Sequence, residues 1–128
     1  MNFDFDVDDE FGSKLAWADE FVRTKVEPLD LLLGHPCDLV DPRRAALIPP
    51  LQQEVRDERL WACHLGPDLG GLGYGQVRLA LLNEILGRSR CAPVVFGCQA
   101  PDSGNAEILA RYGTELHKER YLRPLLEN

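Results

Sequence analysis

The chain has 128 residues, of which 45% are hydrophobic and 27% are charged, and its formal net charge is −7. This length and composition are typical of one globular domain, and they exclude disordered, collagen-like and mucin-like chains. Because no basic stripe is available to neutralise phosphates, the sequence also disfavours binding to nucleic acids.

The first ten residues form an acidic arm that contains no Lys or Arg. The arm supplies five of the seven excess negative charges, from Asp4, Asp6, Asp8, Asp9 and Glu10. An acidic start lacks the features of secretory signals and of Arg-rich transit peptides, and no apolar run approaches the length of a membrane span. We therefore expect a cytoplasmic protein with an acidic arm at residues 1–10 and one helical domain at residues 11–128.

A first amphipathic helix is predicted directly after the arm. Pro28 ends it, and its apolar residues recur at helical spacing: Phe11, Leu15, Ala18, Val22 and Val26. Residues 29–42 mix leucines with Gly and Pro, which is typical of an irregular connection.

Two adjacent prolines, Pro49 and Pro50, fit the opening of a second helix with its body at residues 51–60. Ile48 precedes the first of them and is therefore expected to be extended. Residues 76–86 are apolar on nearly every side, which predicts a central, buried helix with Gly87 at its end.

The last third of the chain predicts three further helices. The first covers residues 93–99, and the second runs to Tyr112 from a cap at Asp102 or Ser103. Gly113 ends the second helix and Thr114 caps the third, which is expected to turn four leucines inward: Leu116, Leu122, Leu125 and Leu126. No segment alternates as a strand does, so the sequence predicts an all-α compact bundle of about five or six helices.

Residues 67–75 form a glycine-rich stretch that could be mistaken for a nucleotide-binding loop. A dinucleotide loop follows a strand, whereas residues 61–65 are short and not strand-like, and the glycine spacing does not match that motif. A tight loop before a helix is the favoured interpretation over a phosphate cradle.

The polar candidates for chemistry are scattered. The four cysteines have no CxxC spacing, and the pairs Cys63–His64 and His35–Cys37 match no zinc template, so buried thiols are favoured over a metal site.

His117 is expected to be exposed to solvent. Glu84 lies on the apolar helix, where a buried carboxylate could be a base, although a structural role is favoured. Trp17 and Trp61 are expected in the core.

Three segments in order carry a recognisable pattern. They are LW at residues 60–61 with PDLGGLG at 67–73, ALLNEILGRS at 80–89, and RYGTELHKERYL at 111–122. Together they resemble the N-terminal domain of the acyl-CoA dehydrogenase family, and the resemblance covers essentially the whole chain after the arm. The run FGCQAPDSGN at 96–105 is most similar to a subgroup whose members are sometimes fused to a phosphotransferase-like domain.

Two positions depart from the family pattern. His117 stands where the family usually has Gln, which is expected to remove the reciprocal half of a capping box while the Thr114 cap remains. Arg59 stands where many relatives have Gly, so a left-handed residue there would cost about 1 kcal/mol.

The resemblance implies α,β-dehydrogenation of acyl-CoA thioesters by a three-domain, FAD-dependent enzyme that is usually a homo-oligomer. It places the catalytic glutamate and most of the flavin site in the middle and C-terminal domains, so this chain alone is expected to bind no FAD and to be inactive. By position, one wall of the acyl pocket would come from Phe96, Gly97, Ala100, Pro101 and Gly104.

Two alternatives stay open. The small residues Gly97, Ala100 and Gly104 lie at helical spacing, which suits a ligand pocket but equally suits close helix packing. The alternative to an enzyme domain is a non-catalytic helical interaction protein derived from the same domain.

Overall fold

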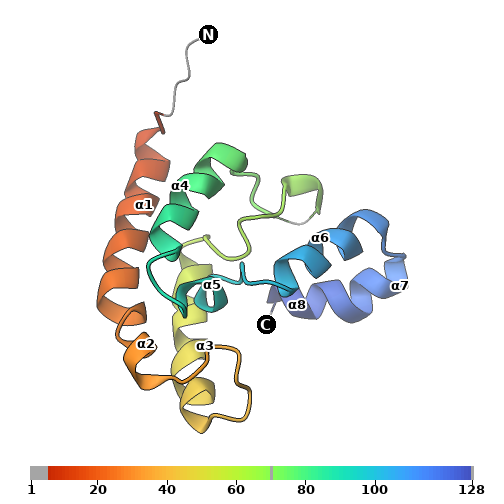
Figure 1. The fold of residues 1–128 in the computed structure, drawn as a ribbon. Helices are drawn as coiled ribbons and strands as arrows, with labels where there is room; N and C mark the ends of the chain where they lie inside the picture. The colour runs from red at the N-terminus through yellow and green to blue at the C-terminus, as the bar shows by residue number, and fades with distance from the viewer. Residues whose placement is uncertain (1–5, 70, 128) are drawn as a thin grey trace.

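A computed structural model describes residues 6–69 and 71–127. These residues form helices and loops and contain no β-strand, which confirms the all-α prediction. Figure 1 shows two groups of helices side by side, with α1–α5 on one side and α6–α8 on the other. The α-helical segments are α1 Asp9–Phe21, α2 Leu29–Leu32, α3 Pro42–Asp57, α4 Gln76–Leu86, α5 Ala92–Val95, α6 Asp102–Tyr112, α7 Glu115–His117 and α8 Arg123–Glu127.

Each group of helices has its own apolar core. The larger core packs α1, α3, α4 and α5 together, and its fully buried members include Val22, Ile48, Val55, Leu60 and Phe96. The smaller core lies under α6 and the C-terminal helix and consists of Leu65, Ala106, Ala110 and Leu122. None of the helices in the described part of the chain is long and apolar enough to cross a membrane.

Helix α1 begins two residues before the first predicted apolar position. The Asp8 carboxylate accepts a hydrogen bond of 2.8 Å from the Phe11 backbone N–H, which satisfies an otherwise free donor of the first turn. Asp9 and Glu10 follow in that turn, where negative charge stabilises the helix dipole. The end of the acidic arm therefore starts the helix, whereas Asp4 lies outside the described residues.

The prediction for residues 29–60 was partly wrong. The connection contains the short helix α2, and α3 begins at Pro42 rather than at the proline pair. Asp41 provides the start signal, because its carboxylate accepts from the Arg43 N–H at 2.9 Å and Pro42 occupies the first helical position. Pro49 and Pro50 lie inside α3, and Ile48 is helical and fully buried rather than extended.

Helix α4 is present as predicted, but it is not buried on all sides. Leu82, Ile85 and Leu86 face the core, whereas Val77 is 49% exposed. Glu84 is also exposed, so its interpretation as a buried carboxylate is wrong. Gly87 caps the helix in an ordinary right-handed conformation.

Two details of α5 and α6 differ from the prediction. Helix α5 ends at Val95, because Gly97 takes a φ of 67° that breaks the helical path. Helix α6 has no side-chain cap from Asp102 or Ser103, since its N-cap position is Pro101. The Asp102 carboxylate instead accepts a hydrogen bond of 2.6 Å from the Gln99 side chain.

The turn from α6 into α7 contains a complete capping box. Thr114 Oγ1 accepts from the His117 N–H at 3.3 Å, and His117 Nδ1 accepts from the Thr114 N–H at 3.4 Å. The expected loss of the reciprocal bond was therefore wrong, because an imidazole nitrogen serves as the acceptor in place of Gln. Leu122 is buried as predicted, but Leu116 is 68% exposed.

Candidate functional site

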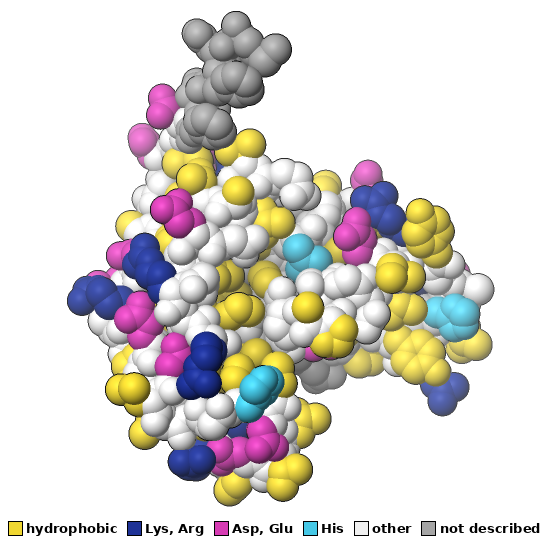
Figure 2. Space-filling view, viewed as in Figure 1, with side chains coloured by type: hydrophobic (Ala, Val, Ile, Leu, Met, Phe, Trp, Pro, Cys, Tyr) yellow, Lys and Arg dark blue, Asp and Glu magenta, His cyan; other side chains and the backbone are white. Residues whose placement is uncertain are grey.

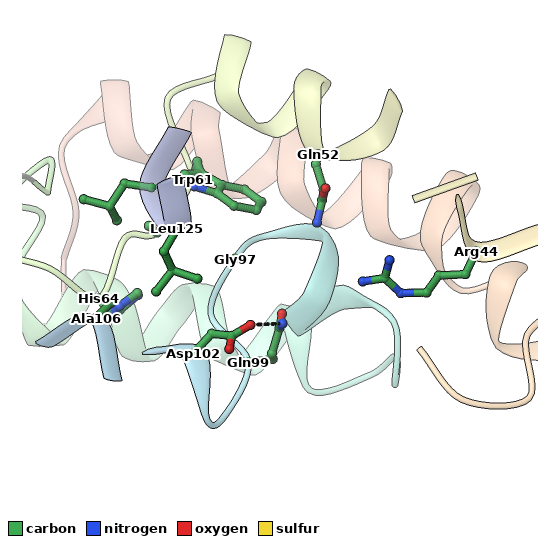
Figure 3. Close-up of a pocket in the computed structure, with 11 residues that line it drawn as sticks. Arg44, Gln52, Trp61, His64, Gly97, Gln99, Asp102, Ala106 and Leu125 are labelled. Atoms are coloured by element: carbon green, nitrogen blue, oxygen red, sulfur yellow. Dashed lines mark hydrogen bonds between the residues drawn. The ribbon is translucent and has the colours of Figure 1, made fainter. Parts of the chain in front are cut away.

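A cavity of about 240 Å³ lies between the two groups of helices (Figure 3). Helix α3 contributes Arg44 and Gln52, and the turn at residues 61–65 contributes Trp61, Ala62 and His64. The opposite side comes from the loop before α6, from α6 and from α8, with Gly97, Gln99, Asp102, Ala106, Leu125 and Leu126. The cavity therefore joins segments that are far apart in the sequence.

The turn that carries Trp61 has an unusual backbone. Arg59 and Ala62 adopt positive φ angles of 59° and 50°, which L-residues rarely take. The fully buried Leu60 anchors the turn in the larger core, and the Ala62 N–H donates to the Phe96 carbonyl at 3.1 Å. Arg59 therefore does adopt the left-handed conformation for which many relatives use Gly.

Gly97 lies directly against the Trp61 ring in the cavity wall. A Cβ built on this residue would lie 2.7 Å from atoms of the Trp61 ring, so no other residue fits there without movement. At this position the small residue serves close packing rather than an open space.

Several polar atoms on the cavity wall are buried without a hydrogen-bond partner in the described structure. They are Trp61 Nε1, both ring nitrogens of His64, and Gln99 Oε1. Burial lowers the pKa of His64, although the nearby Glu107 carboxylate acts in the opposite direction. The cavity thus offers hydrogen-bonding groups to a small polar molecule or to ordered water.

The other polar side chains of the cavity are already engaged. Gln52 Nε2 donates to the Val94 carbonyl at 3.1 Å, and Arg44 Nε donates to the Pro36 carbonyl at 2.7 Å. These bonds fix the two α3 side chains in place, and Figure 3 shows Arg44 and Gln52 on one side of the cavity.

The five residues predicted to line an acyl pocket occupy different environments. Gly97 lines the cavity, whereas Phe96 is fully buried in the larger core, with its ring centroid 6.0 Å from that of Phe21. Ala100, Pro101 and Gly104 are exposed at the start of α6, and a Cβ on Gly104 would meet no atom within 4 Å.

Two of the four cysteines are buried thiols of low reactivity. Cys63 and Cys91 are buried, and desolvation raises the pKa of each thiol to about 12. Thiols with such pKa values are protonated at neutral pH and are poor nucleophiles. Among the residues whose placement is described, His, Cys, Asp and Glu form no group of three that could hold a metal ion.

Sequence reasoning found some of these cavity residues and missed others. Trp61 and Gly97 lie in segments that the family pattern singled out. Gln99 lies in the same run as Gly97, but it was not singled out. His64 and Arg44 carried no local signal of a shared cavity, because only the tertiary structure brings these segments together.

The comparisons with known proteins agree on one family. The family described as "Acyl-CoA dehydrogenase, N-terminal domain" matches residues 15–128. Mouse acyl-CoA dehydrogenase family member 10 is 40% identical over 114 residues, which is 84% of this chain and 11% of the mouse protein. Human acyl-CoA dehydrogenase family member 11 is 43% identical over 81 residues, which is 63% of this chain and 10% of the human protein.

A solved structure from Mycobacterium abscessus, assigned to the acyl-CoA dehydrogenases, has the same fold. It superposes with a TM-score of 0.75 and 38% sequence identity, over 95% of this chain and 32% of that structure. The chain thus spans about a tenth of the length of the mouse and human relatives and about a third of the solved structure. Because the family's N-terminal domain matches residues 15–128, which is most of this chain, the chain belongs to the acyl-CoA dehydrogenase family.

Proposed function

We propose that this chain is the N-terminal domain of an FAD-dependent acyl-CoA dehydrogenase and that it contributes one wall of the acyl pocket. The observation that carries the proposal is the family match over residues 15–128, which includes the exposed small residues Ala100, Pro101 and Gly104 around the start of α6. The proposed reaction is α,β-dehydrogenation of an acyl-CoA thioester, with the catalytic base outside this chain.

The proposed wall has an exposed face and a buried support. Ala100, Pro101 and Gly104 present little side-chain bulk to solvent, so an acyl chain could approach the backbone of α6 closely. Phe96 and Gly97 fix the loop that precedes α6, because Phe96 is buried in the larger core and Gly97 packs against Trp61. In this arrangement the chain positions the substrate and takes no part in proton transfer.

The cavity between the two groups of helices does not fit FAD. Its volume of about 240 Å³ lies below the range of about 300–1,000 Å³ that is usual for cofactor and drug-sized ligands, and FAD is a dinucleotide. We therefore assign no flavin step to the residues of this chain and place the flavin site in further domains.

One observation also fits a second candidate, a non-catalytic helical interaction protein. Helix α4 exposes an apolar strip that includes Val77, Ala80 and Leu81. Such a strip suits contact with another protein as well as contact with further domains of the same enzyme.

A chimera distinguishes the two functions. The chain would replace the N-terminal domain of the Mycobacterium abscessus relative, and dehydrogenation of short and long acyl-CoA thioesters would be measured with an artificial electron acceptor. We expect an active chimera, and we expect Gly104→Phe to raise KM for long acyl chains more than Gly104→Ala does. A folded but inactive chimera would favour the interaction protein, and an active chimera unaffected by Gly104→Phe would contradict the assignment of the wall.

A further inference from the structure

Arg56 carries a partly buried positive charge that has no counter-charge in the described structure. It lies in the last turn of α3, where its guanidinium carbon is 3.8 Å from the ring centroid of Trp61. Its Nε and Nη2 atoms are inaccessible to solvent and have no hydrogen-bond partner. Burial lowers the pKa of Arg56, and no neighbouring acid acts against this effect.

The two unpaired nitrogens of Arg56 form one edge of the guanidinium. The N–H bonds of Nε and Nη2 point in the same direction, and this pair matches the two oxygens of a carboxylate or phosphate group. Stacking on Trp61 fixes the plane of the guanidinium, so the edge is oriented in advance.

A second cavity, of about 210 Å³, lies on this side of Trp61. Arg56 and Arg59 both line it, together with Gly71 and Leu72 from the glycine-rich loop and Leu126 from α8. The side chain of Arg59 forms no ion pair or hydrogen bond with any other residue that the structure describes. Two arginines therefore line the cavity, and none of its lining residues carries a carboxylate.

This arrangement is unusual in a chain of net charge −7. Most of the other Lys and Arg side chains form an ion pair with an acid, as in the pairs Lys25–Glu54 and Arg88–Asp19, and Figure 2 shows basic side chains next to acidic ones on this face of the molecule. The acid next to Arg56 in the sequence, Asp57, accepts a hydrogen bond from the Gln53 side chain instead. The positive charge of this cavity is thus left uncompensated although acids are plentiful.

We propose that the cavity between Arg56, Arg59 and the Gly71–Leu72 segment binds an oxyanion, a carboxylate or phosphate group of a small ligand. Because Nε and Nη2 of Arg56 are closed to solvent in this structure, binding includes a small shift of the neighbouring side chains that exposes this edge to the anion. The C-terminal dipole of α3 opposes an anion here, but the effect of a helix dipole is weaker than two charge-assisted hydrogen bonds to a guanidinium. The inference is separate from the proposed acyl wall, because none of the five residues of that wall lines this cavity.

The test is a titration of the purified chain with inorganic phosphate or with sodium acetate, at ionic strength held constant with NaCl. Trp61 reports on the site by its fluorescence in a Trp17→Phe background and by the NMR shift of its indole N–H. We expect a saturable response to at least one anion, and the comparison of phosphate with acetate identifies which oxyanion the site prefers.

Variants distinguish a specific binding site from general electrostatic attraction of anions. Arg56→Lys keeps the charge but loses the paired N–H edge, so we expect at least about tenfold weaker binding. Arg59→Gln should weaken binding several-fold, whereas Arg120→Gln, which removes an exposed charge in the π-helical segment between α7 and α8, should have no effect.

Three results would overturn the proposal. They are a response that is linear rather than saturable, equal binding by Arg56→Lys and the unmodified chain, and equal weakening by Arg120→Gln and Arg59→Gln. Circular dichroism establishes that each variant is folded, and if Arg56→Lys fails to fold, the comparison of Arg59→Gln with Arg120→Gln decides the matter.

Discussion

The backbone of Gly97 lies directly against the indole ring of Trp61. A Cβ on Gly97 would be 2.7 Å from two ring atoms, and the φ of Gly97 is 67°. Next to this contact, the Ala62 N–H donates to the Phe96 carbonyl at 3.1 Å. The end of α5 and the turn after α3 are thus held together by one close packing contact and one backbone hydrogen bond.

Gly97→Ala is expected to destabilise the protein by about 2–4 kcal/mol. The left-handed backbone accounts for about 1–2 kcal/mol of this cost, and displacement of the Trp61 ring adds a penalty typical of an overpacked core. Urea unfolding followed by circular dichroism measures the change in the free energy of unfolding. Gly104→Ala is the matched control, because a Cβ there meets no atom within 4 Å and helix formation favours Ala. If Gly97→Ala were as stable as Gly104→Ala, the contact between Gly97 and Trp61 would not be as close as described.

Arg59→Gly is expected to stabilise the fold by up to about 1 kcal/mol. The φ of 59° is strained for Arg and unstrained for Gly, although the greater freedom of Gly in the unfolded chain offsets part of the gain. Thermal unfolding with Arg59→Ala as the control measures this, since Ala removes the same side chain but keeps the strain. If the melting temperature of Arg59→Gly were at or below that of Arg59→Ala, the positive φ of residue 59 would not be a source of strain.

Local signals predicted helices well where either a cap or an amphipathic spacing was clear. The Thr114 cap is present as predicted, and the spacing from Phe11 to Val26 forms one continuous helical segment, in which α1 passes into a π-helical turn at Val22–Val26. They failed at α3, where the proline pair at 49–50 was a stronger visible signal than the Asp41–Pro42 start. Two prolines are tolerated inside α3 and Ile48 is fully buried there, so tertiary packing overrides the local preference for an extended residue before proline.

The cavities were less predictable than the helices. The family pattern identified Trp61 as notable, but its contacts with Arg56 on one side and Gly97 on the other depend on how α3, α5 and the turn between them pack. His64 is an example. Its position next to Cys63 in the sequence raised the possibility of metal binding, whereas in the structure His64 lines a cavity together with residues of α6.

His64 is expected to make the protein less stable at mildly acidic pH. Burial lowers its pKa in the folded state below the unfolded value of about 6.5. The unfolded chain therefore binds the proton more readily, so the free energy of unfolding falls as pH drops through about 6.5. Urea unfolding between pH 5 and pH 7.5 should show a smaller pH dependence for His64→Gln than for the unmodified chain. His35→Gln, at an exposed histidine, is the control, and an equal reduction in both variants would show that burial of His64 is not the cause.

Asp30 is expected to contribute stability that is present at neutral pH and lost in acid. Burial alone would raise the pKa of its carboxyl, but hydrogen bonds from Cys91, Ser89 and Arg90 outweigh burial and lower it. Oδ1 accepts from the Cys91 N–H and from Ser89 Oγ, each at 3.1 Å, and so connects α2 to the turn before α5.

Because the folded pKa of Asp30 lies below the unfolded value of about 3.9, the ionised carboxylate stabilises the fold above about pH 4. This stabilisation disappears as pH falls through the folded pKa. Asp30→Asn should therefore cost about 1 kcal/mol at pH 7, a value reduced because the site is only partly buried, and much less near pH 3. Urea unfolding at the two pH values measures this, with Glu115→Gln as an exposed control. A cost for Asp30→Asn that is the same at pH 3 and pH 7 would mean that Asp30 acts through shape and not through its charge.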